Sequence, residues 1–300
     1  MLKIAYHPIY KHPLPLGHRF PMGKYELLHQ QLLYEGTCKE YNFFEPVLLN
    51  NKYFFLTHDA EYVSDLMNLT LDPRIARRIG FPLDEVLIER EITIASGTMK
   101  ASEFALGNGI AMNIAGGTHH AFTNKGEGFC MLNDQAIGAR YLQEKGLVEK
   151  ILIVDLDVHQ GNGTAEIFQN DESVFTFSMH GKKNYPFQKE QSDLDIALEN
   201  GTQDEEYLQV LRETLPKLIA EHNPDFIYYL SGVDIIESDK LGKLSLSIKG
   251  CKERDRFVLE TCKNNNVPVM CSMGGGYSPD IKTIVNAHAN TFRLAQEIFF

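Results

Sequence analysis

The strongest constraint on the fold is a buried strand pattern that ends in closely spaced acidic and imidazole side chains. Residues 151–156 are almost continuously apolar, and a polar stretch with a Gly-Asn-Gly turn follows them. Asp155, Asp157 and His159 alternate along this stretch. In an extended strand, side chains two positions apart point to the same side. The three side chains are therefore predicted to share one face where the strand reaches solvent.

This placement favours a bound cation. Burying two carboxylates beside an imidazole is costly unless a positive charge joins them, and a divalent metal ion is the simplest candidate. Asp234 is the best third ligand, because it follows the apolar strand pattern at residues 226–230. Three protein ligands leave a coordination position open, as in catalytic sites, and the donors suit Zn²⁺ but also Fe²⁺, Co²⁺ or Mn²⁺. In the competing interpretation, Asp157 and Asp234 are loop carboxylates that cap helices.

Short apolar runs alternate with helical patterns along the chain. The predicted strands span residues 2–6, 110–115, 151–156, 174–177, 226–230 and 267–271. The predicted helices span residues 94–106, 133–145, 205–220, 250–263 and 279–296, and Pro216 is expected to kink or interrupt the third. This alternation is typical of parallel βα units with helices on both faces of a sheet. With 300 residues, 43% of them apolar, and no linker or repeat, the chain is predicted to be one domain.

Polar signatures follow five of the predicted strands. In open parallel sheets, ligand sites form beyond the carboxyl ends of the strands, so these segments are expected to converge on one crevice. They span residues 116–120, 157–159, 178–180, 231–234 and 274–277.

Two of these segments bring further candidates for catalysis. His119 and His120 follow a glycine turn, and they are predicted to share the base and acid steps that a metal-activated water and a leaving amine require. Asp155 and Asn162 are candidates to orient them. Tyr277 follows three glycines, and its hydroxyl can donate a hydrogen bond to a developing oxyanion. A phosphate loop is the competing interpretation of the glycines, but the Lys-Ser or Lys-Thr of that motif is missing.

The composition limits the partners and the compartment. The formal net charge of −11 argues against direct nucleic-acid binding, which needs clustered lysine and arginine, and an acidic surface favours cationic substrates. Five cysteines without CxxC spacing argue against a disulfide framework or a cysteine-rich zinc site, so a reducing cytoplasm is predicted. No apolar run approaches the ~18 residues of a membrane span, and the N-terminus lacks a signal-peptide pattern.

Seven segments, in this order along the chain, resemble the motifs of the histone deacetylase family of metal-dependent acyl-lysine hydrolases. Together they span most of the chain, and their joint occurrence is far more specific than any one of them. The forms of residues 18–22 and 184–201 are most similar to the class IV (histone deacetylase 11-like) branch and its bacterial relatives. The seven segments are residues 17–22, 116–120, 126–134, 155–164, 178–180, 234–242 and 274–277.

The resemblance implies a three-layer α/β/α arginase/deacetylase fold. Its central, mostly parallel sheet would have about eight strands, within a single catalytic domain over residues 1–300. The resemblance assigns the general acid and base roles to His119 and His120, and transition-state stabilisation to Tyr277. The implied metal ligands are Asp157, His159 and Asp234.

The resemblance also implies a substrate tunnel and a second ion. The tunnel for the lysine methylenes would be lined by Phe129, Gly128, Tyr185 and Gly275. A structural potassium ion would lie near the catalytic metal, held partly through backbone carbonyls of Asp155, Asp157, His159, Ser178 and Met179. At Asn162, many class I members have Asp, and a neutral amide stabilises an imidazolium less than a carboxylate does.

We therefore expect zinc-dependent hydrolysis of an Nε-acyl-lysine in a protein or peptide, with K⁺ as a structural ion. One alternative is the hydrolysis of acylated polyamines or other small acylated amines. An alternative of another class is a non-catalytic acyl-lysine binding protein, which predicts lost ligands or a lost tyrosine, whereas all are present. The sequence leaves open the acyl-chain length, from acetyl to long fatty acyl, and the oligomeric state.

Overall fold

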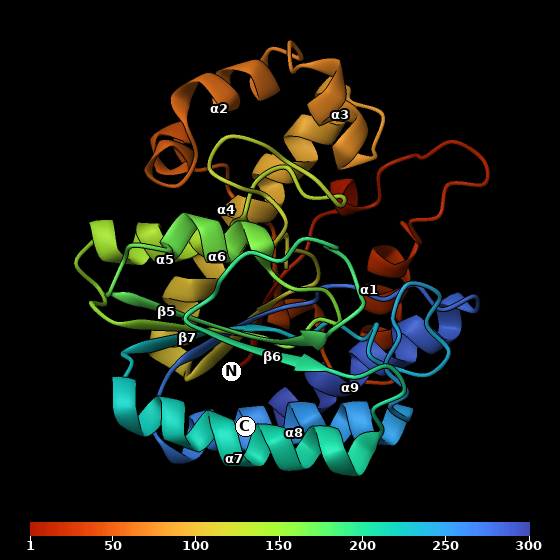
Figure 1. The fold of residues 1–300 in the computed structure, drawn as a ribbon, viewed down its shortest axis with the longest axis vertical. Helices are drawn as coiled ribbons and strands as arrows, with labels where there is room; N and C mark the ends of the chain where they lie inside the picture. Colours follow the sequence, from red (N-terminus) through yellow and green to blue (C-terminus); the bar gives the residue numbers. More distant parts are fainter.

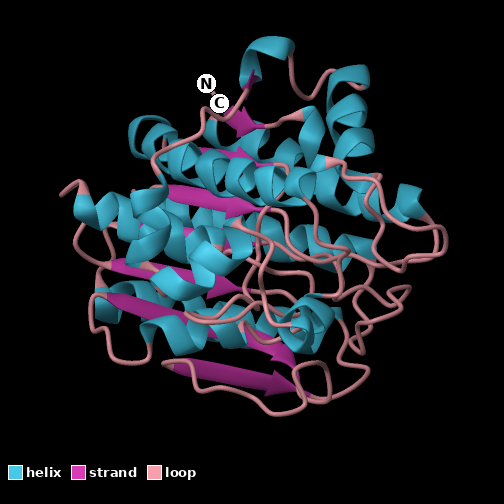
Figure 2. Ribbon diagram, turned by 90° about the horizontal axis from the view of Figure 1, so that it is seen from above, coloured by secondary structure: helices cyan, strands magenta, loops and turns pink.

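The computed structural model describes residues 1–300, and at its centre is one sheet of eight strands. The strands lie in the order β2-β1-β3-β8-β7-β4-β5-β6, and every neighbouring pair is parallel. Figure 2 shows them side by side between helices, which confirms the predicted parallel α/β fold. The strands are β1 (Lys3–Ala5), β2 (Phe43–Phe44), β3 (Ile110–Asn113), β4 (Ile151–Asp155), β5 (Val174–Gly181), β6 (Leu194–Leu198), β7 (Phe226–Leu230) and β8 (Val269–Ser272).

Helices cover both faces of the sheet, which gives three layers (Figure 1). On one face α4 packs against α5, with α6 nearby, and α2 and α3 lie beyond α4. On the other face α9 contacts both α1 and α8, and α7 packs beside α8. The helices are α1 (Lys24–Tyr34), α2 (Ala60–Met67), α3 (Pro73–Ile79), α4 (Glu85–Asn108), α5 (Asp134–Glu144), α6 (Asn162–Phe168), α7 (Asp204–His222), α8 (Ile248–Asn264) and α9 (Ile281–Phe299), with short 3-10 helices at Pro8–Tyr10, Glu40–Asn42 and Asn51–Leu56.

The central strands explain why the polar residues gather at one edge of the sheet. Every residue of β4, β7 and β8 is buried, because helices cover both faces. Such strands are continuous apolar runs rather than alternating ones. Polar residues follow where the strands end, and because all eight strands are parallel, these ends lie along the same edge.

Pro216 does not interrupt its helix, so that part of the expectation is wrong. α7 runs from Asp204 to His222 without interruption. Because proline has no N–H group, the carbonyl of Arg212, four residues earlier, has no donor within the helix. Both residues are exposed, so water can donate a hydrogen bond to that carbonyl. The buried face of α7 packs against α8 and holds the helix in place.

The sequence pattern does not predict several peripheral elements. These are α1, α2, α3 and α6 and the edge strands β2 and β6. β2 has only two residues, and only one of the five residues of β6 is buried, so neither forms an apolar run. α4 begins at Glu85, nine residues before the predicted start, where Asp84 caps it by accepting a hydrogen bond from Leu87 N–H (2.7 Å). No helix has the length and hydropathy that crossing a membrane requires.

Candidate active site

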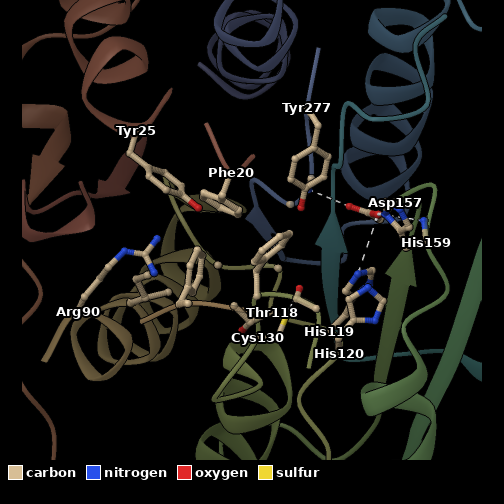
Figure 3. A pocket seen from close by; sticks show the side chains of 18 residues that line it. Phe20, Tyr25, Arg90, Thr118, His119, His120, Cys130, Asp157, His159 and Tyr277 are labelled. Atoms are coloured by element: carbon tan, nitrogen blue, oxygen red, sulfur yellow. Dashed lines mark hydrogen bonds and ion pairs between the residues drawn. The ribbon is translucent and has the colours of Figure 1, made fainter. Parts of the chain in front are cut away.

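The structure brings the three predicted metal ligands together at the carboxyl ends of two neighbouring strands. Asp157 and His159 follow β4, and Asp234 follows β7, which pairs with β4. One donor atom from each residue lies within 4.8 Å of the other two. The Nδ1 atom of His159 is 3.0 Å from Asp157 Oδ1 and 3.1 Å from Asp234 Oδ2. The three side chains therefore point at one small volume, which Figure 3 shows for Asp157 and His159.

Backbone amides of the surrounding loops hold the two carboxylates in place. Val158 N–H donates to Asp234 Oδ1 (3.0 Å), and Gly275 N–H donates to Asp157 Oδ2 (2.8 Å). None of these contacts is with the N-terminus of a helix, so the interpretation as helix caps is wrong. Gly275 must be glycine for this close approach, because a Cβ there would lie 2.0 Å from Asp234 Oδ2.

The chemistry of this cluster fits a divalent metal ion. Asp157 is 2% exposed and Asp234 is 0% exposed, yet neither forms an ion pair with lysine or arginine. Two carboxylates this close together and this deeply buried repel each other unless a cation lies between them. Carboxylate oxygen and imidazole nitrogen are both donor types that zinc and similar divalent ions accept.

The histidine pair lies beside the cluster with both rings oriented by hydrogen bonds. His119 Nδ1 is 2.7 Å from Asp155 Oδ2, and His120 Nδ1 is 2.6 Å from Asn162 Oδ1. The two ring centres are 4.1 Å apart. A carboxylate only accepts hydrogen bonds, so His119 donates through Nδ1 and its Nε2 is free to face the site.

Glu127 fixes the orientation of His120 in the same way, through a residue between them. The Nδ2 atom of Asn162 donates to Glu127 Oε1 (2.7 Å), so the amide oxygen must face His120. His120 then donates through Nδ1, and the lone pair of the neutral ring is on Nε2. Glu127 belongs to a segment that resembles the family motifs, but sequence reasoning assigned it no role.

The two histidines differ in their electrostatic surroundings. Burial disfavours the charged form of His119, but the negative charge and hydrogen bond of Asp155 outweigh burial and raise its pKa. Burial also lowers the pKa of His120 to well below its ordinary value, and the charges of His119 and His159 lower it further. The pair thus combines one ring that can hold an extra proton with one that stays neutral.

Tyr277 faces the cluster from the loop that follows β8. Its backbone N–H donates to Asp239 Oδ2 (2.6 Å), and its ring centre is 6.3 Å from that of His159. Burial raises the pKa of the phenol well above its ordinary value, and Asp157 and Asp234 raise it further. The hydroxyl therefore stays protonated, as a hydrogen-bond donor must. Figure 3 shows the Tyr277 side chain beside Asp157 and His159.

Two buried cations support these loops, and sequence reasoning did not find them. The ammonium group of Lys24 donates to Gly274 O (3.1 Å) and lies 5.5 Å from the centre of the Tyr277 ring. The guanidinium group of Arg254 donates to Gly232 O (2.6 Å) and Leu156 O (3.1 Å), at the ends of β7 and β4. Lys24 is the single lysine or arginine of α1, and Arg254 is one of several basic residues of α8, so neither position is marked as buried by its local sequence.

Two cavities meet at the site. The inner one, about 40 Å³, is lined by Phe20, Tyr25 and Arg90 as well as the site residues (Figure 3). The outer one, about 320 Å³, opens toward the surface. The residues lining both are His120, Gly128, Phe129, His159 and Tyr277.

The predicted tunnel residues lie on these cavities. Gly128 and Phe129 line both, Tyr185 lines the outer cavity and Gly275 the inner one. The ring of Tyr185 is nearly perpendicular to that of His120, with centres 5.0 Å apart. Phe129 adopts a φ of +70°, in the left-handed region that is uncommon outside glycine. Its ring is held between Phe20 and Phe81, whose ring centres are each 5.1 Å from its own.

The residues predicted to hold potassium lie around the ends of β4 and β5. Asp155 and Ser178 are direct partners across these two strands, and both line a cavity of about 10 Å³. Met179 is fully buried. Both carboxylate oxygens of Asp155 already accept hydrogen bonds, from His119 Nδ1 and from Asp157 N–H (3.1 Å). The potassium assignment stays a prediction.

Comparison with known proteins shows the family. The model of the histone deacetylase domain matches residues 18–292. An uncharacterized protein of Picosynechococcus sp. strain PCC 7002 is 45% identical, with 99% of each chain covered. Histone deacetylase 2 of Arabidopsis thaliana is 28% identical, and the match covers 87% of this chain and 70% of that protein. Histone deacetylase clr6 of Schizosaccharomyces pombe is 30% identical, and the match covers 87% of this chain and 69% of that protein. The solved structure of the HDA15 HD domain has a TM-score of 0.79, with 96% of this chain and 89% of that chain covered, at 18% identity. The chain belongs to the histone deacetylase family and has its three-layer arginase/deacetylase fold.

Proposed function

We propose that the chain is a metal-dependent hydrolase that removes acyl groups from the Nε atom of acyl-lysine in a protein or peptide. Family membership indicates hydrolase activity of the deacetylase type. The observation that carries the proposal is the convergence of Asp157, His159 and Asp234 beside the histidine pair, where the inner and outer cavities meet. This geometry places three candidate ligands, candidate proton carriers and room for a substrate in one place.

The side chains around the cluster have the properties that amide hydrolysis needs. A divalent ion held by Asp157, His159 and Asp234 would supply Lewis acidity, which polarises a carbonyl and makes a water molecule more acidic. His120 accepts the water proton at Nε2, and His119 donates a proton to the departing amine. Those roles follow from their hydrogen bonds to Asn162 and Asp155. The Tyr277 hydroxyl donates to the carbonyl oxygen as it gains negative charge.

The outer cavity holds the side chain of the substrate. The rings of Phe129 and Tyr185 would pack against the lysine methylenes, with Gly128 and Gly275 leaving room for the stem and the acyl group. Phe20 and Tyr25 line the inner cavity together with residues of the cluster, and we propose that this cavity receives the acyl group, acetyl or longer.

The finer assignments are also proposals. We assign the chain to the class IV branch, with Zn²⁺ as the resident ion, Fe²⁺ or Co²⁺ as substitutes, and K⁺ near Asp155 and Ser178. Residues 1–300 act as one catalytic domain. Five free, buried cysteines suit a reducing cytoplasm.

The experiment is an acyl-chain series on one lysine peptide, from acetyl to myristoyl, with the released carboxylate measured by mass spectrometry and the metal content of the same sample determined. We expect hydrolysis of at least one peptide, loss of hydrolysis after chelation, and recovery with Zn²⁺. If the protein binds the peptides but releases no carboxylate, the hydrolase proposal is wrong and the alternative of a non-catalytic acyl-lysine binding protein takes its place. Faster hydrolysis of acetylpolyamines than of every peptide would replace acyl-lysine as the substrate.

A further inference from the structure

The outer cavity has a charge opposite to that of the whole chain. The chain has 40 acidic and 29 basic residues, yet the thirteen residues that line this cavity include four basic residues and no acidic one. All four basic residues are exposed and none forms an ion pair. We call these residues the basic rim: Arg19, Arg78, Lys183 and Lys243.

Two arginines of the basic rim lie beside Phe129. The guanidinium carbon of Arg19 is 4.9 Å from the centre of the Phe129 ring. The backbone carbonyl of Arg78 accepts a hydrogen bond from Gly128 N–H (3.0 Å), which ties the end of α3 to the same wall. Burial and the Glu127 carboxylate raise the pKa of Tyr185, and the charge of Arg78 opposes them. Arg78 and Tyr185 line the same cavity.

The two lysines of the basic rim lie beside Tyr185. The ammonium group of Lys243 donates to the backbone carbonyl of Lys183 (2.8 Å), so the loops after β5 and β7 meet here. Lys183 precedes Tyr185 by two residues, and both line the outer cavity. One basic pair thus accompanies each of the two aromatic walls.

Four unpaired cations around one concave opening produce a positive potential that attracts anions and repels cations. The net charge of −11 led to the opposite expectation, a preference for cationic substrates, and the lining of the outer cavity contradicts it. A free acylated polyamine, whose remaining amines are positive, is therefore an unfavourable substrate for this opening.

We infer that the basic rim selects acyl-lysines that lie in acidic sequence, with Asp or Glu on both sides of the modified lysine. This inference rests on the proposed hydrolysis of acyl-lysine. A peptide fits better than a small anion, because a peptide that extends to both sides of its lysine can reach both basic pairs. A small anion beside one wall meets only one pair.

The test compares two peptides that differ only in the residues flanking one acetyl-lysine, Asp on both sides in one and Asn in the other. We expect kcat/KM at low salt to be about tenfold higher for the acidic peptide. The ratio should fall toward one in 0.5 M salt, where the Debye length is below about 5 Å. Ketone isosteres of both peptides, which cannot be hydrolysed, give dissociation constants by calorimetry and separate binding from turnover.

The variant replaces all four rim residues with Gln, and its matched control removes the same charge elsewhere. In the rim variant the ratio should fall to about one. The control carries Lys150→Gln, Arg212→Gln, Lys217→Gln and Lys263→Gln, four exposed positions that line neither cavity of the site, and should keep the full ratio.

The outcomes separate this inference from the proposed function. Equal kcat/KM and equal isostere affinity for the two peptides, or a preference that survives in the rim variant, would overturn the inference while hydrolysis stands. A different result is that neither peptide is hydrolysed, but the isostere of the Asp-flanked peptide binds more tightly than the other and loses this advantage in the rim variant. The proposed hydrolase activity is then wrong, and the selection of acidic peptides stands.

Discussion

The inner and outer parts of the site have opposite character. The inner part, with Asp157 and Asp234, is buried and negative, and strand ends position it. The outer part, the basic rim, is exposed and positive and lies on loops and helix ends. Only a few residues separate them, since His120 and Phe129 line both cavities. In the functions proposed above, the two parts have different tasks that follow from their depth: the buried acids would hold a cation, and the exposed basic residues would select the peptide that approaches it.

The largest effect should come from the inner part. Asp234→Asn removes one ligand charge, and because a catalytic metal supplies several kcal/mol, kcat/KM should fall by about 10³-fold or more. Metal analysis should show loss of the bound ion at the same time. Asp59→Asn, at an exposed position with no capping hydrogen bond, is the control and should change neither value. An Asp234→Asn protein with full metal content and full activity would show that Asp234 is not a metal ligand, and the inner part would then have no role distinct from that of the outer part.

Tyr277→Phe should have the next largest effect. Removing a single oxyanion donor costs about 10²–10³-fold in kcat. Metal content should stay as in the unchanged protein, because the hydroxyl is not a ligand. Tyr34→Phe, whose side chain is 92% exposed, serves as the control. Unchanged turnover on the same acyl-lysine peptide would show that the tyrosine only packs against Phe20 and Phe129.

Sequence reasoning was strong for the inner part and weak for the outer part, for a physical reason. Asp157 and His159 are two positions apart at the end of one apolar run, so the alternation of a strand predicts their common direction. Arg19 and Lys243 of the basic rim come from distant parts of the chain, and no local pattern predicts that they line the same cavity. Their meeting depends on how loops pack.

The same limit applies to the supports of the inner part. Lys24 and Glu127 are buried, but each stands in a segment whose pattern gives no sign of burial. The strands of the sheet centre were predicted because helices cover both of their faces, which leaves an apolar run in the sequence. Most residues of the edge strand β6 are only partly buried, so its sequence is not a continuous apolar run.

Glu127 links the two parts and should give an intermediate effect. Glu127→Ala removes the acceptor that orients Asn162, so kcat/KM should fall by about 10–100-fold, as for other residues that act through a partner. Glu127→Gln keeps an acceptor oxygen and should recover most of the loss. If both variants lower activity only as far as they lower the melting temperature, Glu127 is structural and does not position His120.

The smallest effect concerns the stability of the inner scaffold. Burial lowers the pKa of His58 from 6.5 to about 4, and its ring nitrogens bond Phe122 O (2.7 Å) and Asn133 N–H (3.0 Å). Between these pH values only the unfolded chain binds the proton, so acid favours unfolding. The contribution is complete above pH 6.5 and falls by about 1 kcal/mol between pH 7 and pH 5.5. Urea unfolding of His58→Gln should show a shallower loss over that range, and an identical slope would contradict this role.

The most direct test of the central claim is anomalous diffraction at the zinc edge from a crystal of the protein grown with Zn²⁺. The account predicts one strong peak about 2.0–2.2 Å from an oxygen of Asp157, a nitrogen of His159 and an oxygen of Asp234. A structure without a peak there, or with zinc bound only at other residues, would contradict it.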